Sequence, residues 1–230
     1  MQDAEFNVRR GDTQQLSAMD KPSNYYRHTR REMIQFIPKD SKRFLDVGCG
    51  DGRFGALLKE TLGQIEVWGV EPTEPAFNSA KDILDRAVHG LFDDALPLPR
   101  TYFDTVIFND SLEHFVDHLA GLRTAHGLLR ESGWLVASIP NVRFWPHVQS
   151  YIGEGDWKYQ DAGILDRTHL RFFTKRSIPR ELEAAGFEVV RLVGINPCWV
   201  GLKFKLLNLA FGHRLDDMRF EQFAVVARKR

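Results

Sequence analysis

Short segments rich in apolar residues alternate with longer amphipathic segments along most of the chain. The short segments are expected to form strands at 43–47, 66–70, 87–91, 103–108 and 133–139. Between them, apolar residues recur with helical spacing at 54–62, 75–84 and 119–129. Strands that are apolar on both faces and joined by helices are typical of a parallel sheet with helices on both sides. The pattern therefore predicts an α/β domain.

This regular pattern is interrupted after Pro140 and then returns. Residues 141–173 hold aromatic residues, glycines and many charges without clear periodicity, which predicts an insertion or lid over the carboxyl edge of the sheet. Beyond it we expect a helix at 177–185, a strand at 187–193, a helical segment at 199–211 and a strand at 220–226. Residues 1–22 are polar and are expected to be a flexible arm, followed by a helix at 23–37 that Pro38 ends. One domain over 23–230, with an acceptor-side lid at 141–173, is the expected organisation.

Composition and charge narrow the class of protein. The chain has 230 residues, of which 43% are hydrophobic, and its 31 basic and 31 acidic residues leave no basic excess for nucleic acid. Cys49 and Cys198 have no metal-binding or disulfide spacing, which fits a reducing cytoplasm. No apolar run approaches the ~20 residues of a membrane span. We therefore expect a cytoplasmic domain without a transmembrane segment, and peripheral membrane contact stays open.

A glycine-rich loop follows the first expected strand and reads Asp46-Val47-Gly48-Cys49-Gly50-Asp51-Gly52. Glycines between a strand and a helix let the backbone approach a ligand, and the helix N-terminus favours an anionic group. The spacing DxGxGxG differs from the GxGxxG of dinucleotide-binding proteins. Glu71, at the end of the next strand, is placed to accept hydrogen bonds from ribose hydroxyls.

Residues 25–187 resemble a class I S-adenosylmethionine-dependent methyltransferase. The motifs match in the family's order at 44–52, 70–72, 103–107, 111–114, 128–129 and 133–136. The resemblance implies a Rossmann-like, doubly wound, seven-stranded sheet that is mostly parallel, with an antiparallel last strand in a hairpin. It also implies S-adenosyl-L-methionine as the cofactor. A shorter resemblance, at 139–142 and 166–174, is to bacterial methyltransferases found with glycosyltransferases in polysaccharide and sugar-modification pathways.

The first resemblance also assigns cofactor contacts. Gly48 and Gly50 are expected beside the amino-acid portion, and Glu71 on the ribose. The loop after the third strand departs from the usual Gly-Asp pair, so that Asp93 is the expected adenine contact, unless it is a solvated turn residue. The expected contacts are Asp46, Gly48, Cys49, Gly50, Glu71, Pro72, Phe92, Asp93, Asn109, Asp110, Tyr26 and Arg30. For Tyr26 and Arg30, which would reach the methionine carboxylate, ordinary surface positions are the alternative.

Two segments are candidates for catalysis. Methyl transfer from a sulfonium is an in-line displacement that also requires proton removal when the acceptor is a hydroxyl. Glu113 and His114 follow the central strand at the edge where ligands bind, and a histidine has a pKa suited to a general base near neutral pH. His169, in the segment 163–174, is the second candidate base. A structural role is the alternative for both.

The segment around His169 also supplies candidate substrate contacts. Alternation along it would put Arg167, His169 and Arg171 on one side, unless it is a solvated strand edge. The shorter resemblance implies a sugar, nucleotide sugar or lipid-linked glycan as acceptor, on which tryptophans could stack. The expected substrate contacts are Asn141, Trp145, Trp157, Asp166, Arg167 and Arg171. No metal is expected, although Asp161, Asp166 and His169 come nearest to a ligand set.

Three functional hypotheses follow. The first is an O-methyltransferase of a sugar or glycan that uses His114 or His169 as the base. The second is a methyltransferase of another small molecule, such as a quinol, a natural product or a carboxylic acid. In that case residues 199–207 could be a lipid-facing helix with basic residues. The third is a binding module that keeps the cofactor pocket but does no chemistry.

Overall fold

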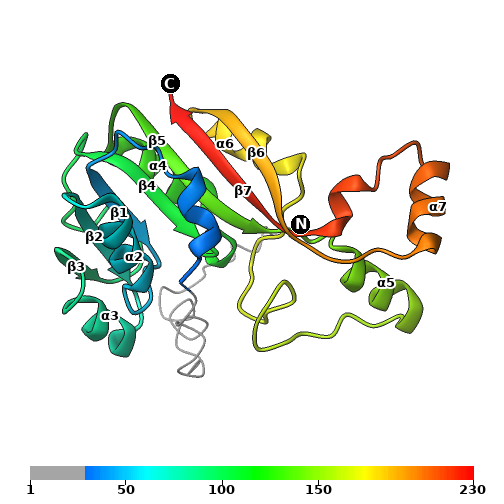
Figure 1. Cartoon of the computed structure of the whole chain (residues 1–230). Helices are drawn as coiled ribbons and strands as arrows, with labels where there is room; N and C mark the ends of the chain where they lie inside the picture. The colour runs from blue at the N-terminus through cyan, green and yellow to red at the C-terminus, as the bar shows by residue number, and fades with distance from the viewer. Residues whose placement is uncertain (1–28) are drawn as a thin grey trace, which may run out of the picture.

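The fold is described from a computed structural model, which places residues 29–230 (Figure 1). These residues form a seven-stranded sheet in the order β3-β2-β1-β4-β5-β7-β6. Strands β1 to β5 are parallel, and β7 runs antiparallel to both of its neighbours, β5 and β6. The predicted α/β fold, doubly wound and Rossmann-like with an antiparallel last strand, is confirmed. The strands are β1 (Arg43–Val47), β2 (Glu66–Glu71), β3 (Arg86–His89), β4 (Phe103–Asn109), β5 (Leu129–Pro140), β6 (Phe187–Pro197) and β7 (Phe220–Lys229).

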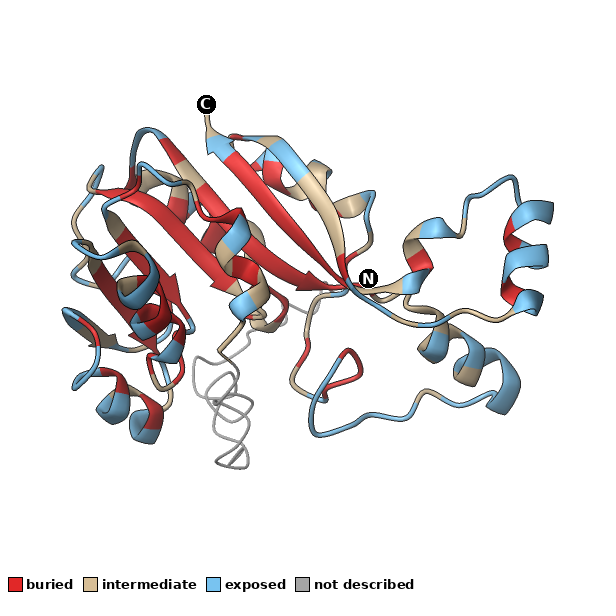
Figure 2. Ribbon diagram, viewed as in Figure 1, coloured by how far each residue is buried: buried red, intermediate tan, exposed pale blue. Residues whose placement is uncertain are grey.

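Helices cover both faces of the sheet because the central strands are buried on both faces (Figure 2). One hydrophobic cluster contains residues of α4 and α6, and the other contains residues of η2, α2 and α3. Strong amphipathicity in α2 and α6 made these two helices predictable from the sequence. The helices are η2 (Arg31–Phe36), α2 (Arg53–Leu62), α3 (Glu74–Ala80), η3 (Leu112–His114), α4 (His118–Leu128), α5 (Trp145–Glu154), α6 (Ser177–Ala184), α7 (Leu202–Ala210) and η4 (Asp216–Arg219).

Some expected boundaries were wrong. The third helix ends at Ala80 instead of residue 84, and β5 begins four residues before the expected 133. In the described part of the helix expected at 23–37, a 3₁₀ helix covers Arg31–Phe36. The segment 141–173 contains the helix α5, none of whose residues is buried. The sequence analysis missed it, although Trp145, Val148 and Ile152 recur with helical spacing. Its signals were Pro146 in the first turn and Gly155 in a left-handed conformation after the last.

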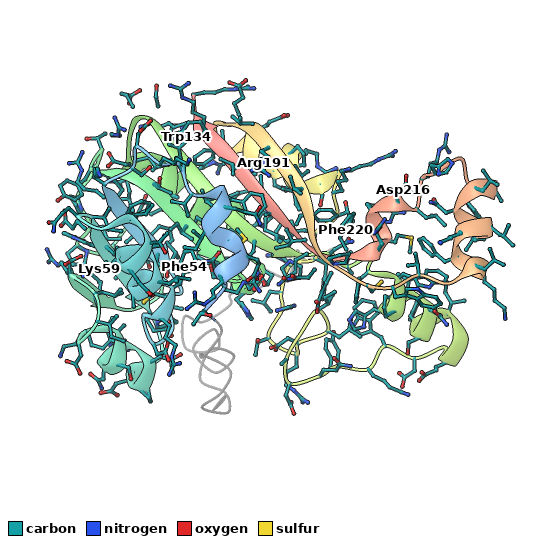
Figure 3. The ribbon with its side chains drawn as sticks, viewed as in Figure 1. Phe54, Lys59, Trp134, Arg191, Asp216 and Phe220 are labelled. Atoms are coloured by element: carbon teal, nitrogen blue, oxygen red, sulfur yellow. The ribbon has the colours of Figure 1, made fainter. Side chains whose placement is uncertain are left out.

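Helices α5 and α7 project together from the sheet beside the ends of β6 and β7 (Figure 1). Trp145 of α5 packs on Phe204 of α7, with ring centroids 4.9 Å apart. Asp216, which is labelled in Figure 3, accepts a hydrogen bond from the Asn208 amide of α7 at 2.6 Å. No helix between residues 29 and 230 is long and apolar enough to cross a membrane.

Candidate cofactor and acceptor site

A cavity of about 1270 Å³ opens at the carboxyl ends of β1, β2, β4 and β5. This is the edge at which open α/β sheets bind ligands. The segment 162–170 and the Arg30 region form further parts of its wall. The predicted site residues that line it are Arg30, Asp46, Gly48, Cys49, Gly50, Glu71, Pro72, Phe92, Asp93, Asn109, Asp110, Glu113, His114 and His169. Tyr26 lies outside the described residues.

The glycine loop forms one wall of the cavity and needs its glycines. Gly48, Gly50 and Gly52 have φ of 74°, 55° and 82°, in the region that disfavours other residues. A Cβ on Gly48 would lie 2.9 Å from Cβ of Ser111, closer than real side chains pack. The backbone N–H groups of Gly48 and Cys49 donate to the Val70 carbonyl at 2.8 and 3.1 Å, which fastens the loop to β2.

Two buried carboxyl groups lie beneath this loop. Oε2 of Glu71 accepts a hydrogen bond from the Gly50 N–H and Oε1 accepts one from the Thr73 N–H, both at 2.9 Å. Burial raises the pKa of Glu71. Burial and the negative charge of Glu71 also raise the pKa of Asp46 to about 7. A ligand that carries positive charge would suit this part of the cavity, because it would favour the ionised forms of both carboxyl groups.

Several buried polar atoms near the loop have no hydrogen-bond partner among the described residues. They are Oδ1 of Asp46, Oγ of Ser111 and both side-chain polar atoms of Asn109. Buried polar groups in folded proteins are nearly always hydrogen-bonded. With Glu71 they form a set of donors and acceptors that fits the amino-acid portion and the ribose of S-adenosylmethionine. Ser111 was not among the predicted contacts, although it follows Asp110 directly at the end of the central strand.

Arg30 and Asp110 line the cavity but bind each other. Nη1 of Arg30 lies 2.5 Å from Oδ2 of Asp110, and its Nη2 donates to Oε1 of Gln222 at 3.1 Å. The other Asp110 oxygen accepts hydrogen bonds from Ser138 and Gln222. This ion pair occupies the groups with which each residue was expected to contact the cofactor. The sequence analysis missed Gln222, which β7 brings to β4 only in the folded sheet.

The loop after β3 contributes an apolar wall at Phe92. This ring is buried and packs edge-on against Phe108 and Phe115, at centroid distances of 5.9 and 6.2 Å. Asp93 is exposed, and its Oδ1 accepts the Ala95 N–H at 2.8 Å, as in a solvated turn. The adenine contact assigned to Asp93 stays a prediction.

Glu113, His114 and His169 also line the cavity and form one cluster there. The loop that carries His169 is fastened to η3 by the N–H groups of Leu170 and Arg171, which both donate to the Glu113 carbonyl at 2.9 Å. The two imidazole rings lie edge-to-face with centroids 4.8 Å apart, and Nε2 of His169 is 3.7 Å from Oε1 of Glu113. The two histidines that the sequence analysis offered as alternative bases therefore belong to one cluster.

Burial dominates the electrostatics of this cluster. Glu113 is 1% exposed, and burial together with the negative charge of Asp110 raises its pKa well above the ordinary value. Nδ1 of His114 lies 3.1 Å from the Thr168 carbonyl, and Nδ1 of His169 lies 3.0 Å from the Ile164 carbonyl. These contacts fix the orientation of both rings.

None of the expected substrate contacts is among the residues that line this cavity, and those assignments stay predictions. Asn141 is fully buried, and its amide donates to the carbonyls of Asp217 and Phe220, which fastens β5 to η4 and β7. Trp145 packs on α7 as described, and Trp157 lies between Tyr151 and Phe172, with centroids 5.8 Å from each. Trp157 thus packs within the segment 141–173 and Trp145 packs against α7, and neither residue lines the cavity.

The expected alternation along 163–173 is wrong because this segment forms turns and isolated bridges, with no regular strand. Arg167 is exposed and pairs with Asp161 at 2.8 Å, whereas His169 is buried. Asp166 is buried and accepts hydrogen bonds from the N–H and hydroxyl of Thr168. The Arg171 guanidinium donates to the Val116 carbonyl.

Comparison with known proteins identifies the family of this chain. The profile of a family described as "Methyltransferase domain" matches residues 23–192. A trans-aconitate 2-methyltransferase of Methylobacterium radiotolerans is 30% identical over 111 residues, which are 48% of this chain and 43% of that protein. This chain therefore spans less than half the length of that relative. A ubiquinone biosynthesis O-methyltransferase of Parvibaculum lavamentivorans is 25% identical over 69% of this chain and 64% of its own.

Solved structures share the fold. A SAM-dependent methyltransferase from Archaeoglobus fulgidus has a TM-score of 0.67 and 22% identity, and the match covers 90% of this chain and 97% of that one. One from Mesorhizobium loti has a TM-score of 0.61 and 16% identity, covering 91% and 99%. With the glycine loop, the buried Glu71 and the sheet order in place, the chain belongs to the methyltransferase domain family and is a class I methyltransferase that uses S-adenosylmethionine.

Proposed function

We propose that this enzyme methylates a hydroxyl group of a small molecule. The observation that carries the proposal is the cluster of Glu113, His114 and His169, which lines the same cavity as the glycine loop. S-adenosylmethionine supplies a methyl group that is already activated on a sulfonium. A hydroxyl acceptor must lose its proton as it reacts, and the two imidazoles beside the buried Glu113 carboxyl group are suited to promote this step.

The cofactor half of the cavity would hold its ligand through complementary charge. Asp46 and Glu71 would face positive charge and ribose hydroxyls, while Asn109 and Ser111 would supply their unpaired amide and hydroxyl groups. Fixing both reactants in one cavity turns the reaction into an intramolecular one, which accounts for much of the rate gain in transfers of this kind.

For the acceptor, we propose a compact and partly apolar molecule. The cavity wall near the cluster includes Phe115, Val116, Ile164 and Leu170. Two of the relatives are named after small molecules: one is a trans-aconitate 2-methyltransferase and the other a ubiquinone biosynthesis O-methyltransferase. A sugar or glycan acceptor, and with it a role in polysaccharide biosynthesis, is supported only by the resemblance of 139–142 and 166–174. Its aromatic contacts do not line this cavity. Since residues 162–170 border the cavity, we also propose that 141–173 acts as the lid on the acceptor side.

An assay with labelled S-adenosylmethionine tests the proposal. A panel of phenols and quinols, hydroxy acids and nucleotide sugars would be offered, and the methylated atom would be identified by mass spectrometry and NMR. We expect a methyl ether from the first group. Methylation of nucleotide sugars alone would favour the sugar hypothesis. Methylation of nitrogen or carboxylate groups alone would overturn the proposal that the acceptor is a hydroxyl.

The cluster is tested by substitution. We expect His114→Ala to lower turnover by roughly 10²–10⁴-fold without a change in cofactor affinity. His213→Ala is the control, because its side chain is 67% exposed and lies outside the cavity. Equal turnover in the two variants would contradict a role of the cluster in catalysis. Tight cofactor binding without any transfer across the panel would instead favour a binding module.

A membrane-bound acceptor such as a quinol is a second candidate, favoured by the surface of α7. Trp199, Leu202 and Leu206 are 89%, 72% and 58% exposed, and Leu209 is 63% exposed. The exposed Lys203 and Lys205 stand among them. Apolar side chains with interspersed lysines suit the surface of an anionic bilayer. We propose that this helix makes peripheral contact with membranes.

A further inference from the structure

We propose that Glu113, His114 and His169 bind a divalent transition-metal cation of the Zn²⁺, Co²⁺ or Fe²⁺ class. The sequence spacing had pointed away from a metal, with Asp161, Asp166 and His169 as the nearest ligand set. In the structure Asp161 pairs with Arg167, and Asp166 binds Thr168. The set that the fold assembles is a different one. Its consequence for catalysis rests on the proposed methylation of a hydroxyl.

The three side chains converge on one point. One ligand atom from each, taken from the two imidazoles and the carboxylate, can be chosen so that all lie within 4.8 Å of one another. Bonds of ~2.0–2.2 Å from nitrogen and oxygen to zinc place ligands about 3.5 Å apart. Small side-chain rotations would therefore bring the three atoms to coordination distance. Two histidines and one carboxylate with a remaining open position are a ligand set typical of catalytic zinc and non-haem iron sites.

The histidines are oriented as metal ligands usually are. A backbone carbonyl can only accept a hydrogen bond, so the contacts of Nδ1 with Thr168 and Ile164 place the proton on Nδ1 in each ring. The neutral imidazole then has its lone pair on Nε2. A carbonyl behind the imidazole fixes both tautomer and ring direction in metal sites, and it raises the basicity of the coordinating nitrogen.

The glutamate provides the second, independent observation. Glu113 is 1% exposed, and neither of its carboxylate oxygens has a hydrogen-bond partner within residues 29–230. Its Oε1 lies 3.7 Å from Nε2 of His169, beyond the range of a hydrogen bond. Burying a carboxylate without hydrogen bonds is costly. A cation between the carboxylate and the imidazoles would satisfy these oxygens and offset the cost.

The cation would act on the acceptor hydroxyl. Coordination to the open position lowers the pKa of a bound hydroxyl and orients it. The acceptor oxygen gives its proton to water and forms its new bond to the methyl carbon. The electron pair of the broken carbon–sulfur bond stays on sulfur, and the charge of the cation does not change. Glu113, His114 and His169 are then ligands that hold the cation, and no histidine is required as the base.

Metal binding is measured on the full chain without an acceptor. The protein is stripped with a chelator, dialysed and titrated with Co²⁺, whose visible absorption reports nitrogen and oxygen ligands, and then with Zn²⁺ in competition. We expect one equivalent per chain at micromolar concentration. His169→Ala and Glu113→Gln should each weaken binding at least 10-fold, while cofactor titration verifies that the variants are folded. His118→Ala is the matched control, because His118 forms a separate histidine–carboxylate pair with Glu181 at 3.1 Å.

The absence of stoichiometric Co²⁺ or Zn²⁺ binding would overturn the cation site, as would binding that none of the cluster variants weakens. If Glu113→Gln does not fold, His114→Ala and His169→Ala decide the same question. If metal-free protein transfers methyl groups to a hydroxyl at the full rate, the proposed role of the cation is overturned while the proposed function is supported. Stoichiometric binding that the variants abolish, without transfer to any hydroxyl in the panel, would support the cation site and overturn the proposed function.

Discussion

The buried carboxyl of Asp46 predicts a specific dependence of stability on pH. Asp46 is 2% exposed, and burial followed by the charge of Glu71 raises its pKa from 3.8 to about 7. A carboxyl with a raised pKa binds its proton more tightly in the folded chain than in the unfolded one. Its contribution to stability is therefore complete below pH 3.8, and it is lost as the pH rises from there through about 7.

The substitution Asp46→Asn removes this titration. Each pKa unit corresponds to about 1.4 kcal/mol, so that ionising Asp46 lowers the free energy of unfolding by about 4 kcal/mol at pH 8. About 2.5 kcal/mol of this loss develops between pH 5 and pH 8. The amide of the variant must find hydrogen-bond partners in the same buried place, which sets an offset in stability from wild type that does not depend on pH. Between pH 5 and pH 8, we expect the free energy of unfolding of the variant to rise by about 2.5 kcal/mol relative to that of wild type.

Urea unfolding of both proteins without cofactor, at several values between pH 5 and pH 8, measures this difference. Asp93→Asn is the control, since Asp93 is exposed in a turn and should leave the difference from wild type nearly constant. A constant difference for Asp46→Asn as well would refute the reasoning that burial suppresses its ionisation. At pH 8, where Asp46 of wild type is ionised, the variant should also bind S-adenosylmethionine more weakly, because it lacks one of the two negative charges beneath the loop.

Three further substitutions test other parts of the molecule. Gly48→Ala and Gly155→Ala both place alanine at positive φ, which costs roughly 1–2 kcal/mol, but only the first meets a neighbour at 2.9 Å. Calorimetry should therefore show loss of cofactor binding for Gly48→Ala alone. Glu71→Gln should lower cofactor affinity roughly 10–100-fold, since hydrogen bonds to a charged group contribute ~1.5–3 kcal/mol; unchanged affinity would remove Glu71 from the site. Leu206→Glu should reduce sedimentation with anionic vesicles, whereas Val190→Glu, 58% exposed on β6, should not; equal sedimentation would refute membrane contact by α7.

Much of the fold follows from local signals. Strands buried on both faces must be apolar along their length, and α2 and α6 must present one apolar face, so that both patterns are visible in the chain. Helix α5 has apolar residues at helical spacing but buries none of them, and it is short and surrounded by glycines and charges, so its pattern did not stand out in the sequence. The tryptophans of the insertion illustrate the same difficulty. A sequence shows that Trp145 and Trp157 are aromatic, but whether they contact a substrate or Phe204 and Phe172 depends on packing.

The sequence by itself determined the cofactor half of this protein, because the glycine loop and Glu71 belong to adjacent strand–turn–helix units. There, positive φ at Gly48 and Gly50 requires glycine, and strand order brings the carboxylate to the loop. Only the tertiary structure decided the acceptor half. It joins Glu113 and His114 to His169 through a loop of irregular backbone, for which no periodicity exists to be recognised. It also buries the glutamate, and burial depends on the whole fold.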